Sequence, residues 1–138
     1  MTTRSDIVTA ARGWLGVPWR HQGRNEHGVD CVGLLVVVAR ALGLSDYDSA
    51  AYGRDPSGDG FLKHFGEAGG TRVSPSKAEE GDIAVFRSGP YPVHAGFLTL
   101  KHGVRHVLHA SASAGKVVEE PVTTAAPLVA CFRLPGVE

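Results

Sequence analysis

The 138-residue sequence has few cysteines, no surplus of charge of either sign and no long apolar run. Its two cysteines, Cys31 and Cys131, lie too far apart to match a zinc ribbon, a zinc finger or a redox pair. Acidic and basic side chains number 14 each, which leaves no basic footprint for nucleic acid or for an anionic membrane. The longest apolar run, Leu34 to Ala39, is too short to span a bilayer. We therefore expect neither nucleic-acid binding nor membrane insertion.

A secretion signal is also lacking at the start of the sequence. Residues 1–15 mix acidic and basic side chains and contain no apolar core of signal-peptide length. The hydrophobic fraction of 43% and the charged fraction of 20% are those of an ordinary globular protein. We expect one domain, residues 1–138, which is made in a cytoplasm and is carried by some other device if it acts outside the cell.

The hydrophobic pattern predicts two helices in the first third of the chain. The first is expected between Ser5 and Gly16, where apolar residues recur at helical spacing: Ile7, Ala11, Trp14 and Leu15. The second covers residues 31–44 and is apolar on most sides, so we expect it to be buried at the centre of the fold. Asp30 is its expected N-cap, and Gly43 is its expected stop.

From Gly81 onward, the pattern changes to that of strands. We expect five of them, at residues 82–87, 93–100, 104–110, 116–122 and 128–134. A further short helix is expected at residues 61–65. Helices followed along the chain by an antiparallel sheet indicate an α+β fold.

Cys31 stands where a polar loop, residues 17–29, leads into the second helix. Backbone N–H groups at a helix N-terminus carry partial positive charge and favour a thiolate. Cys31 is therefore a candidate nucleophile. On position alone, a small buried hydrophobic side chain is the more common outcome.

A cysteine nucleophile needs a base that accepts its proton and later protonates the leaving amine. His94, in the predicted strand 93–100, is the best candidate, and the small Gly96 on the same face would leave room for a substrate. His109, near the end of strand 104–110, is placed to orient the His94 ring if the two strands form a hairpin. Without Cys31, His94 would be interpreted as a solvent-facing strand histidine.

A zinc site built from Cys31 and three histidines is the main chemical alternative. It requires His94, His106 and His109 to converge. The last two are separated by an odd number of positions and so point to opposite faces of a strand. No His-x-x-x-His helix motif is present. We therefore expect no metal and no other cofactor.

Five short segments occur in an informative order: residues 11–19 (ARGWLGVPW), 28–34 (GVDCVGL), 81–86 (GDIAVF), 94–97 (HAGF) and 107–111 (VLHAS). Together they resemble the NlpC family of bacterial and phage cell-wall cysteine peptidases. The corresponding family motifs are a Gly-x-Pro-Tyr turn, Asp-Cys-Ser-Gly-Leu, a Gly-Asp strand, His-Val-Gly-Ile and Ile-His-Ala-Ser. The resemblance covers roughly residues 7–133 and implies a papain-like fold, in which the central helix carries the nucleophile.

The resemblance also implies a role for each matching residue. Cys31 would be the nucleophile, His94 the general base and His109 the orienting third residue. The Cys31 backbone N–H would bind the oxyanion together with a second donor, near the position where the family has a tyrosine and this chain has Trp19. The His94–His109 spacing is longer than is common in the family, which we attribute to a longer hairpin turn at residues 100–104.

Substrate binding is where this sequence departs from the family pattern. The Trp19 indole N–H donates a hydrogen bond but cannot accept one. Asp30 is retained, but Val32 replaces the serine that helps the aspartate to grip a free amine in some relatives, so we do not expect a strict free-amine requirement. Gly96 either permits close approach of the substrate backbone or marks a strand bulge.

The implied substrate is a peptidoglycan stem peptide, often cut between D-glutamate and the diamino acid. The polar segment 21–24 (HQGR) and the missing signal resemble single-domain members carried on phage tails. This implies a location on the tail of a virion or phage-like particle, tail structural proteins as partners, and opening of the wall during DNA delivery. Two alternatives stay open: an N-acetylmuramoyl-L-alanine amidase with the same triad, and a structural tail protein with little activity.

Overall fold

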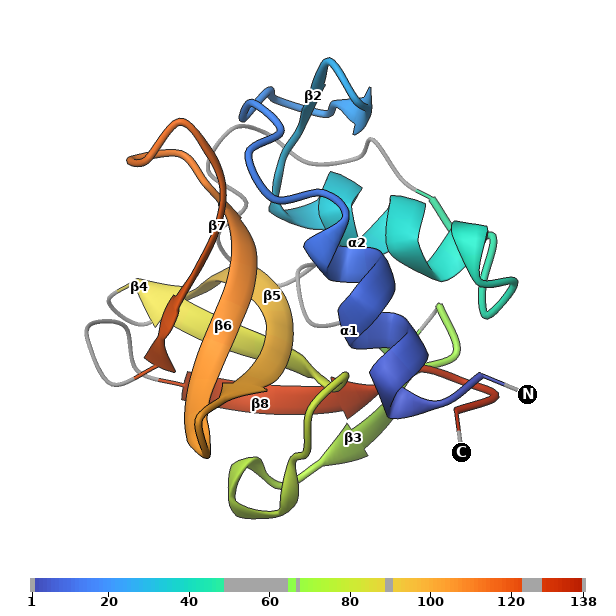
Figure 1. The fold of residues 1–138 in the computed structure, drawn as a ribbon. Coiled ribbons are helices and arrows are strands. Elements are labelled where there is room, and N and C mark those ends of the chain that lie inside the picture. Colours follow the sequence, from blue (N-terminus) through green and yellow to red (C-terminus); the bar gives the residue numbers. More distant parts are fainter. Residues whose placement is uncertain (1, 49–64, 67, 89–90, 123–127, 138) are drawn as a thin grey trace.

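Two helices pack on one side of a six-stranded antiparallel sheet (Figure 1). The computed structural model describes residues 2–48, 65–66, 68–88, 91–122 and 128–137. The strand order is β3-β8-β4-β5-β6-β7, and every neighbouring pair is antiparallel. This arrangement confirms the α+β fold class expected from the sequence.

The first helix, α1, spans Arg4–Arg12 and is fixed by a capping box. The Thr3 hydroxyl accepts a hydrogen bond from the Asp6 backbone N–H, and the Asp6 carboxylate accepts one from the Thr3 backbone N–H. The expected start at Ser5 is therefore wrong, because Thr3 supplies the cap. The helix also ends before the predicted Gly16, and Leu15 beyond it is 43% exposed rather than part of the buried face.

The second helix, α2, spans Cys31–Ala41 and lies in the centre of the fold. Asp30 is its N-cap, as predicted. Nearly every residue from Cys31 to Ala39 is buried, which explains a helix that is apolar on most sides. Gly43, with φ +70°, takes the left-handed conformation just after the helix ends. No helix in the described part of the chain is long and apolar enough to cross a bilayer.

The strands of the large sheet are β3 Thr71–Val73, β4 Ile83–Ser88, β5 Tyr91–Lys101, β6 Val104–Ser111, β7 Lys116–Pro121 and β8 Leu128–Arg133. Five of these match the predicted strands to within two residues at each end. The sequence did not predict β3, the small hairpin of β1 Arg24–Asn25 and β2 Gly28–Val29, or the 3-10 helix η1 Pro75–Lys77. Such short elements carry no hydrophobic period. The helix expected at residues 61–65 falls almost wholly outside the described residues.

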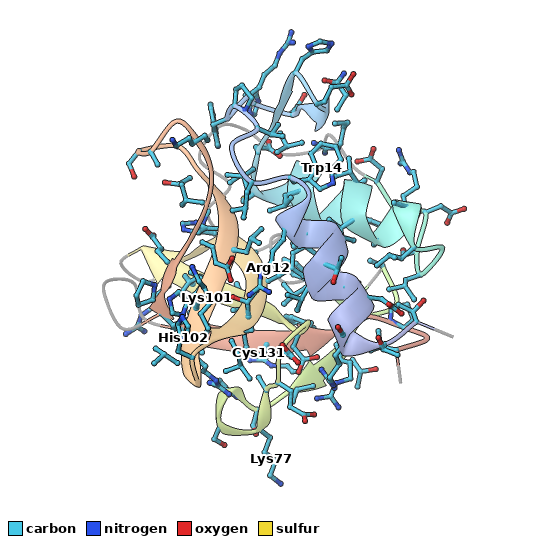
Figure 2. All side chains as sticks on the ribbon, in the orientation of Figure 1. Arg12, Trp14, Lys77, Lys101, His102 and Cys131 are labelled. Carbon is cyan, nitrogen blue, oxygen red and sulfur yellow. The ribbon has the colours of Figure 1, made fainter. Side chains whose placement is uncertain are left out.

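Two apolar clusters cover the two faces of the sheet. The larger lies between the helices and the sheet and contains Leu34, Val38, Phe97 and Leu108. The smaller lies on the opposite face and contains Phe86, Leu98 and Cys131. Figure 2 labels Cys131 among the side chains of the fold. Cys31 belongs to the larger cluster, and both cysteines are free thiols. The two thiols are therefore separated by the sheet.

The β5–β6 hairpin turns through two residues only. Lys101 pairs with Val104, and the intervening His102 and Gly103 have φ values of +54° and +76°. Positive φ at both central positions is typical of the tight type I′ turn that suits the twist of a hairpin. The longer turn expected at residues 100–104 is therefore wrong. The spacing between the two site histidines comes from long strands instead.

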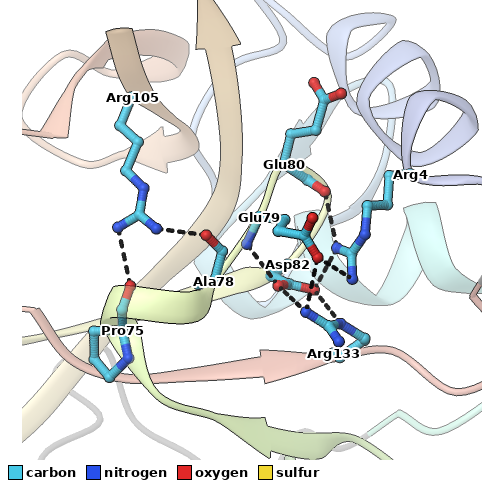
Figure 3. Close-up of polar contacts among 8 residues, drawn as sticks. All are labelled: Arg4, Pro75, Ala78, Glu79, Glu80, Asp82, Arg105 and Arg133. Atoms are coloured by element: carbon cyan, nitrogen blue, oxygen red, sulfur yellow. Dashed lines mark hydrogen bonds and ion pairs between the residues drawn. The ribbon is translucent and has the colours of Figure 1, made fainter. Parts of the chain in front are cut away.

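Asp82, directly before β4, contacts residues from three parts of the fold (Figure 3). Its carboxylate is 1% exposed and accepts hydrogen bonds from the Arg4 and Arg133 guanidinium groups and from the Glu79 backbone N–H. Burial on its own would raise the pKa of Asp82, but these donors outweigh burial and hold the pKa below its ordinary value. The aspartate of the Gly-Asp segment thus ties α1 to the end of β8 and to the start of β4.

Candidate active site

Cys31 occupies the first position of α2, with its side chain almost fully buried. Burial, followed by the negative charge of Asp30, raises the pKa of the thiol to about 12. The backbone N–H groups of Ala95, Val32 and Cys31 itself lie close to the sulfur and oppose that rise. The N–H groups at the helix start therefore lower the pKa of the thiol as expected, but burial raises the pKa by more. At neutral pH, the resting side chain is a thiol rather than a thiolate.

The effect of the Ala95 N–H on the thiol shows that the sulfur lies near β5, at the residue that follows His94. Within the described residues, no hydrogen bond joins the sulfur directly to the His94 ring. Thiol–imidazole contacts are often long without substrate and tighten when it binds. The structure thus brings Cys31 to the strand that carries the candidate base.

His94 and His109 are brought into direct contact by the β5–β6 register. Phe97 pairs with Leu108, and continuing this antiparallel pairing sets His109 opposite Gly96. His94 is two residues from Gly96, so both histidines project from the same face as diagonal neighbours. His94 Nε2 lies 2.5 Å from His109 Nδ1, and the rings meet edge to face with centroids 4.7 Å apart.

His94 is a neutral imidazole at physiological pH. Burial, followed by the repulsion that arises when the neighbouring His109 is also protonated, lowers the pKa of His94 to about 4. Because its Nε2 faces His109, the nitrogen that remains to accept a proton is Nδ1. A neutral histidine with a lone pair available is what a general base requires.

Glu120 extends the histidine pair and was not predicted from the sequence. Its Oε1 lies 2.9 Å from His109 Nε2. His109 pairs with Val118 in β7, so Glu120 is again a diagonal neighbour on the same face. The only sequence signal for Glu120 is that it lies on the same face of its strand as Val118. That signal identifies a neighbour of His109 only when the β6–β7 register is known. Three successive strands thus contribute one polar side chain each to a continuous row.

The Asp30 carboxylate makes its hydrogen bonds to groups within the protein. Its two oxygens accept hydrogen bonds from the backbone N–H groups of Gly33 and Gln22, each at 2.7 Å, and the Arg24 guanidinium lies 3.4 Å away. These contacts tie the loop before α2 to the helix start. Gly33 fits this arrangement because a Cβ there would lie 2.1 Å from the Gly23 carbonyl oxygen.

Trp19 and Val32 both pack against the apolar cluster that contains Cys31. The Trp19 backbone pairs with Val29, two residues before Cys31, and Trp19 is partly buried. Val32 packs on the same cluster. Their part in oxyanion or substrate binding stays a prediction.

The expected parity of the histidines in β6 is observed. His106 pairs with Thr99 and faces away from His109, and its ring contacts the Val104 carbonyl oxygen. Across the described residues, no group of three His, Cys, Asp or Glu side chains is arranged to hold a metal ion. The zinc alternative therefore has no support from the geometry.

A comparison with known protein families tests the family resemblance that the sequence motifs indicated. The sequence profile of the NlpC/P60 family matches residues 16–130. The chain belongs to the NlpC/P60 family. Comparison with curated proteins gives no significant match.

Solved structures of NlpC/P60 proteins share this fold at low sequence identity. The NlpC/p60 domain of the peptidoglycan hydrolase SagA is 22% identical, with a TM-score of 0.62 over 92% of this chain and 97% of that chain. A family protein from Bacillus cereus is 18% identical, with a TM-score of 0.71 over 96% of this chain but only 40% of its own. An N-acetylmuramoyl-L-alanine amidase from Bacteroides uniformis is 15% identical, with a TM-score of 0.65 over 94% and 99%. These similarities confirm the papain-like NlpC/P60 fold.

In this NlpC/P60 chain, we expect the close packing of His109 against β5 to require a glycine at position 96. A Cβ at position 96 would lie 2.7 Å from the His109 Cβ and 2.8 Å from the Leu108 carbonyl oxygen. We predict that Gly96→Ala lowers the free energy of unfolding by about 2 kcal/mol, measured by urea denaturation, because overpacking forces β5 and β6 apart. Gly66→Ala is the control, since a Cβ there meets nothing within 4 Å. Equal stability of the two variants would contradict the close packing at Gly96.

The depressed pKa of His94 predicts a pH-dependent stability. Between about pH 6.5 and 4, the unfolded chain binds a proton at this residue that the folded chain does not, so stability falls as the pH falls. The loss should reach at most about 3 kcal/mol at pH 4. Urea denaturation of wild type and His94→Gln across this range measures it, and the variant should show a flatter profile. Parallel profiles would contradict burial of a neutral His94.

Proposed function

We propose that the protein is a cysteine hydrolase that cleaves amide bonds in the peptide part of peptidoglycan. One observation carries the proposal: the Cys31 sulfur, at the start of α2, contacts β5 beside the His94–His109 pair. This supplies a nucleophile, a neutral base and a group that orients the base. Family membership supports the reaction class, and the similarity to the NlpC/p60 domain of the peptidoglycan hydrolase SagA supports the substrate.

The proposed reaction begins with two neutral groups. His94 Nδ1 removes the thiol proton as the sulfur attacks the amide carbonyl carbon. Backbone N–H groups of Cys31 and Val32, which lie close to the sulfur at the helix start, would bind the developing oxyanion. The imidazolium of His94 then protonates the leaving amine, and the C–N bond breaks to leave a thioester. A water molecule, deprotonated by His94, hydrolyses the thioester and restores the thiol.

We place the scissile bond between D-glutamate and the diamino acid of the stem peptide, as the motif resemblance implies. The alternative is the bond between N-acetylmuramic acid and L-alanine, since two similar structures are described as N-acetylmuramoyl-L-alanine amidases. Mass spectrometry of digested muropeptides separates the two. A new free amine on the diamino acid supports the endopeptidase, and a new free amine on L-alanine supports the amidase.

The contacts of Asp30 support a relaxed requirement at the peptide end. Both of its oxygens are engaged by Gly33, Gln22 and Arg24, and Val32 provides no hydroxyl beside it. We propose that the enzyme does not depend on a free amine held by this aspartate. Comparing stem peptides with free and acetylated L-alanine ends tests this. A strong preference for the free amine would contradict it.

We further propose that the protein acts from the tail of a virion or phage-like particle, where it opens the wall during DNA delivery. The support is the sequence of segment 21–24, which resembles that of tail-borne members. Electron microscopy of purified particles with an antibody against this chain tests the location. Label on the tail tip supports the proposal, and label absent from particles that contain tails contradicts it.

A further inference from the structure

We propose that Glu120 is a positioning residue that fixes the tautomers of His109 and His94. It belongs to β7, whereas the two histidines belong to β6 and β5, so the row crosses three strands. The contacts are successive: Glu120 Oε1 to His109 Nε2 at 2.9 Å, and His109 Nδ1 to His94 Nε2 at 2.5 Å. The inference rests on the proposed function, because a tautomer of His94 matters for catalysis only if His94 is the base.

The positions of the protons follow from the chemistry of the carboxylate. A carboxylate only accepts hydrogen bonds, so the nitrogen facing Glu120 must carry the proton, and neutral His109 is the Nε2–H tautomer. Its Nδ1 then has a lone pair and accepts a hydrogen bond from His94 Nε2–H. His94 in turn keeps a lone pair on Nδ1, the nitrogen that must take the thiol proton. Glu120 thus determines the reactive tautomer two side chains away.

Without the Glu120 carboxylate, the direction of the hydrogen bond between His109 and His94 can reverse. His109 would be free to carry its proton on Nδ1 and donate it to His94 Nε2. His94 would then hold its own proton on Nδ1 and could not act as the base. Glu120 has a half-exposed side chain, with 52% of its surface accessible, whereas His109 is only about a tenth accessible. A substitution at Glu120 can therefore change the proton pattern while leaving the buried part of the row packed.

The test uses a lysine, which only donates hydrogen bonds and so imposes the opposite tautomer. We expect Glu120→Lys to lower kcat by about 10- to 100-fold with little change in KM, and Glu120→Asp to retain most of the activity. Glu26→Lys is the control, since Glu26 is an exposed glutamate whose side chain lies 3.7 Å from His27. Thermal unfolding shows whether each variant is folded.

Nitrogen-15 NMR of the histidine rings, recorded without substrate, gives a readout that packing alone would not move. In wild type and Glu26→Lys, we expect Nε2–H tautomers at both His94 and His109. In Glu120→Lys, we expect Nδ1–H at both. Nδ1–H tautomers in the wild-type rings would overturn the proposal. It would also be overturned if Glu120→Lys kept both the wild-type tautomers and the wild-type kcat. A wild type with the expected tautomers but no hydrolytic activity would count against the proposed function and would still support the role of Glu120.

Discussion

Replacing Cys31 by alanine is expected to abolish hydrolysis of the stem peptide, lowering kcat by roughly 10⁴-fold or more. The sulfur would form the bond to substrate, and neither the apolar side chains of its cluster nor the backbone N–H groups near it can replace a nucleophile. The fold should survive, because removing one small buried sulfur costs about 1 kcal/mol. Stem-peptide turnover followed by mass spectrometry measures the first effect, and urea denaturation measures the second.

Cys131→Ala is the matched control for this experiment. Its thiol is also free and fully buried, but it lies in the smaller cluster on the other face of the sheet. We expect a similar loss of stability without loss of activity. Turnover by Cys31→Ala at the wild-type rate would contradict a cysteine mechanism, and inactivity of both variants would show that destabilisation alone explains the loss.

Replacing His94 by glutamine is expected to lower kcat by about 10³-fold, which is within the usual contribution of a general base. The amide matches the imidazole in polarity but cannot accept the thiol proton at neutral pH. The effect on kcat should be far larger than the effect on KM, since the ring takes part in proton transfer rather than in binding. Steady-state kinetics on the stem peptide measures both constants.

His106→Gln is the control for His94→Gln. His106 lies in the neighbouring strand β6 but faces the opposite side of the sheet from the His94–His109 pair. We expect its kinetics to match those of wild type. Equal losses in the two variants would mean that the assay reports general damage to the β5–β6 hairpin and not the role of His94.

The main elements of the fold were predictable because they carry strong periodic signals. The run from Cys31 to Ala39 is apolar on most sides and long enough to favour a buried helix over a strand, and Asp30 is a side chain that caps helices well. Alternation predicted the long strands to within two residues. The two- and three-residue strands, such as β1 at Arg24–Asn25, were not predictable, because they depend on contacts formed only after folding.

The sequence could predict those features of the site that depend only on the alternation of side chains along one strand. Parity placed His106 and His109 on opposite faces of their strand, and the expected hairpin brought His94 near His109, as observed. It could not reveal Glu120, because that requires the register of β6 against β7. Nor could it reveal the ionisation of Cys31, because the balance between burial and helix-start N–H groups depends on how tightly the chain closes around the sulfur.

These features describe a site that is neutral at rest. The pKa of Cys31 is raised to about 12, and that of His94 is lowered to about 4, so neither group is charged at pH 7. Proton transfer must then accompany the attack on the substrate rather than precede it. A row of side chains that fixes which nitrogen of His94 bears the lone pair is important in such a site, because no preformed ion pair orients the ring.

The central claim is that the Cys31 sulfur attacks the cell-wall peptide, and an acid-quenched reaction tests it most directly. The protein is mixed with a stem peptide, denatured in acid during turnover and digested, and the acylated residue is identified by mass spectrometry. We predict one thioester-linked acyl group, located on Cys31 and absent from Cys31→Ala. An acyl group on any other residue, or continued product release by Cys31→Ala, would contradict the account.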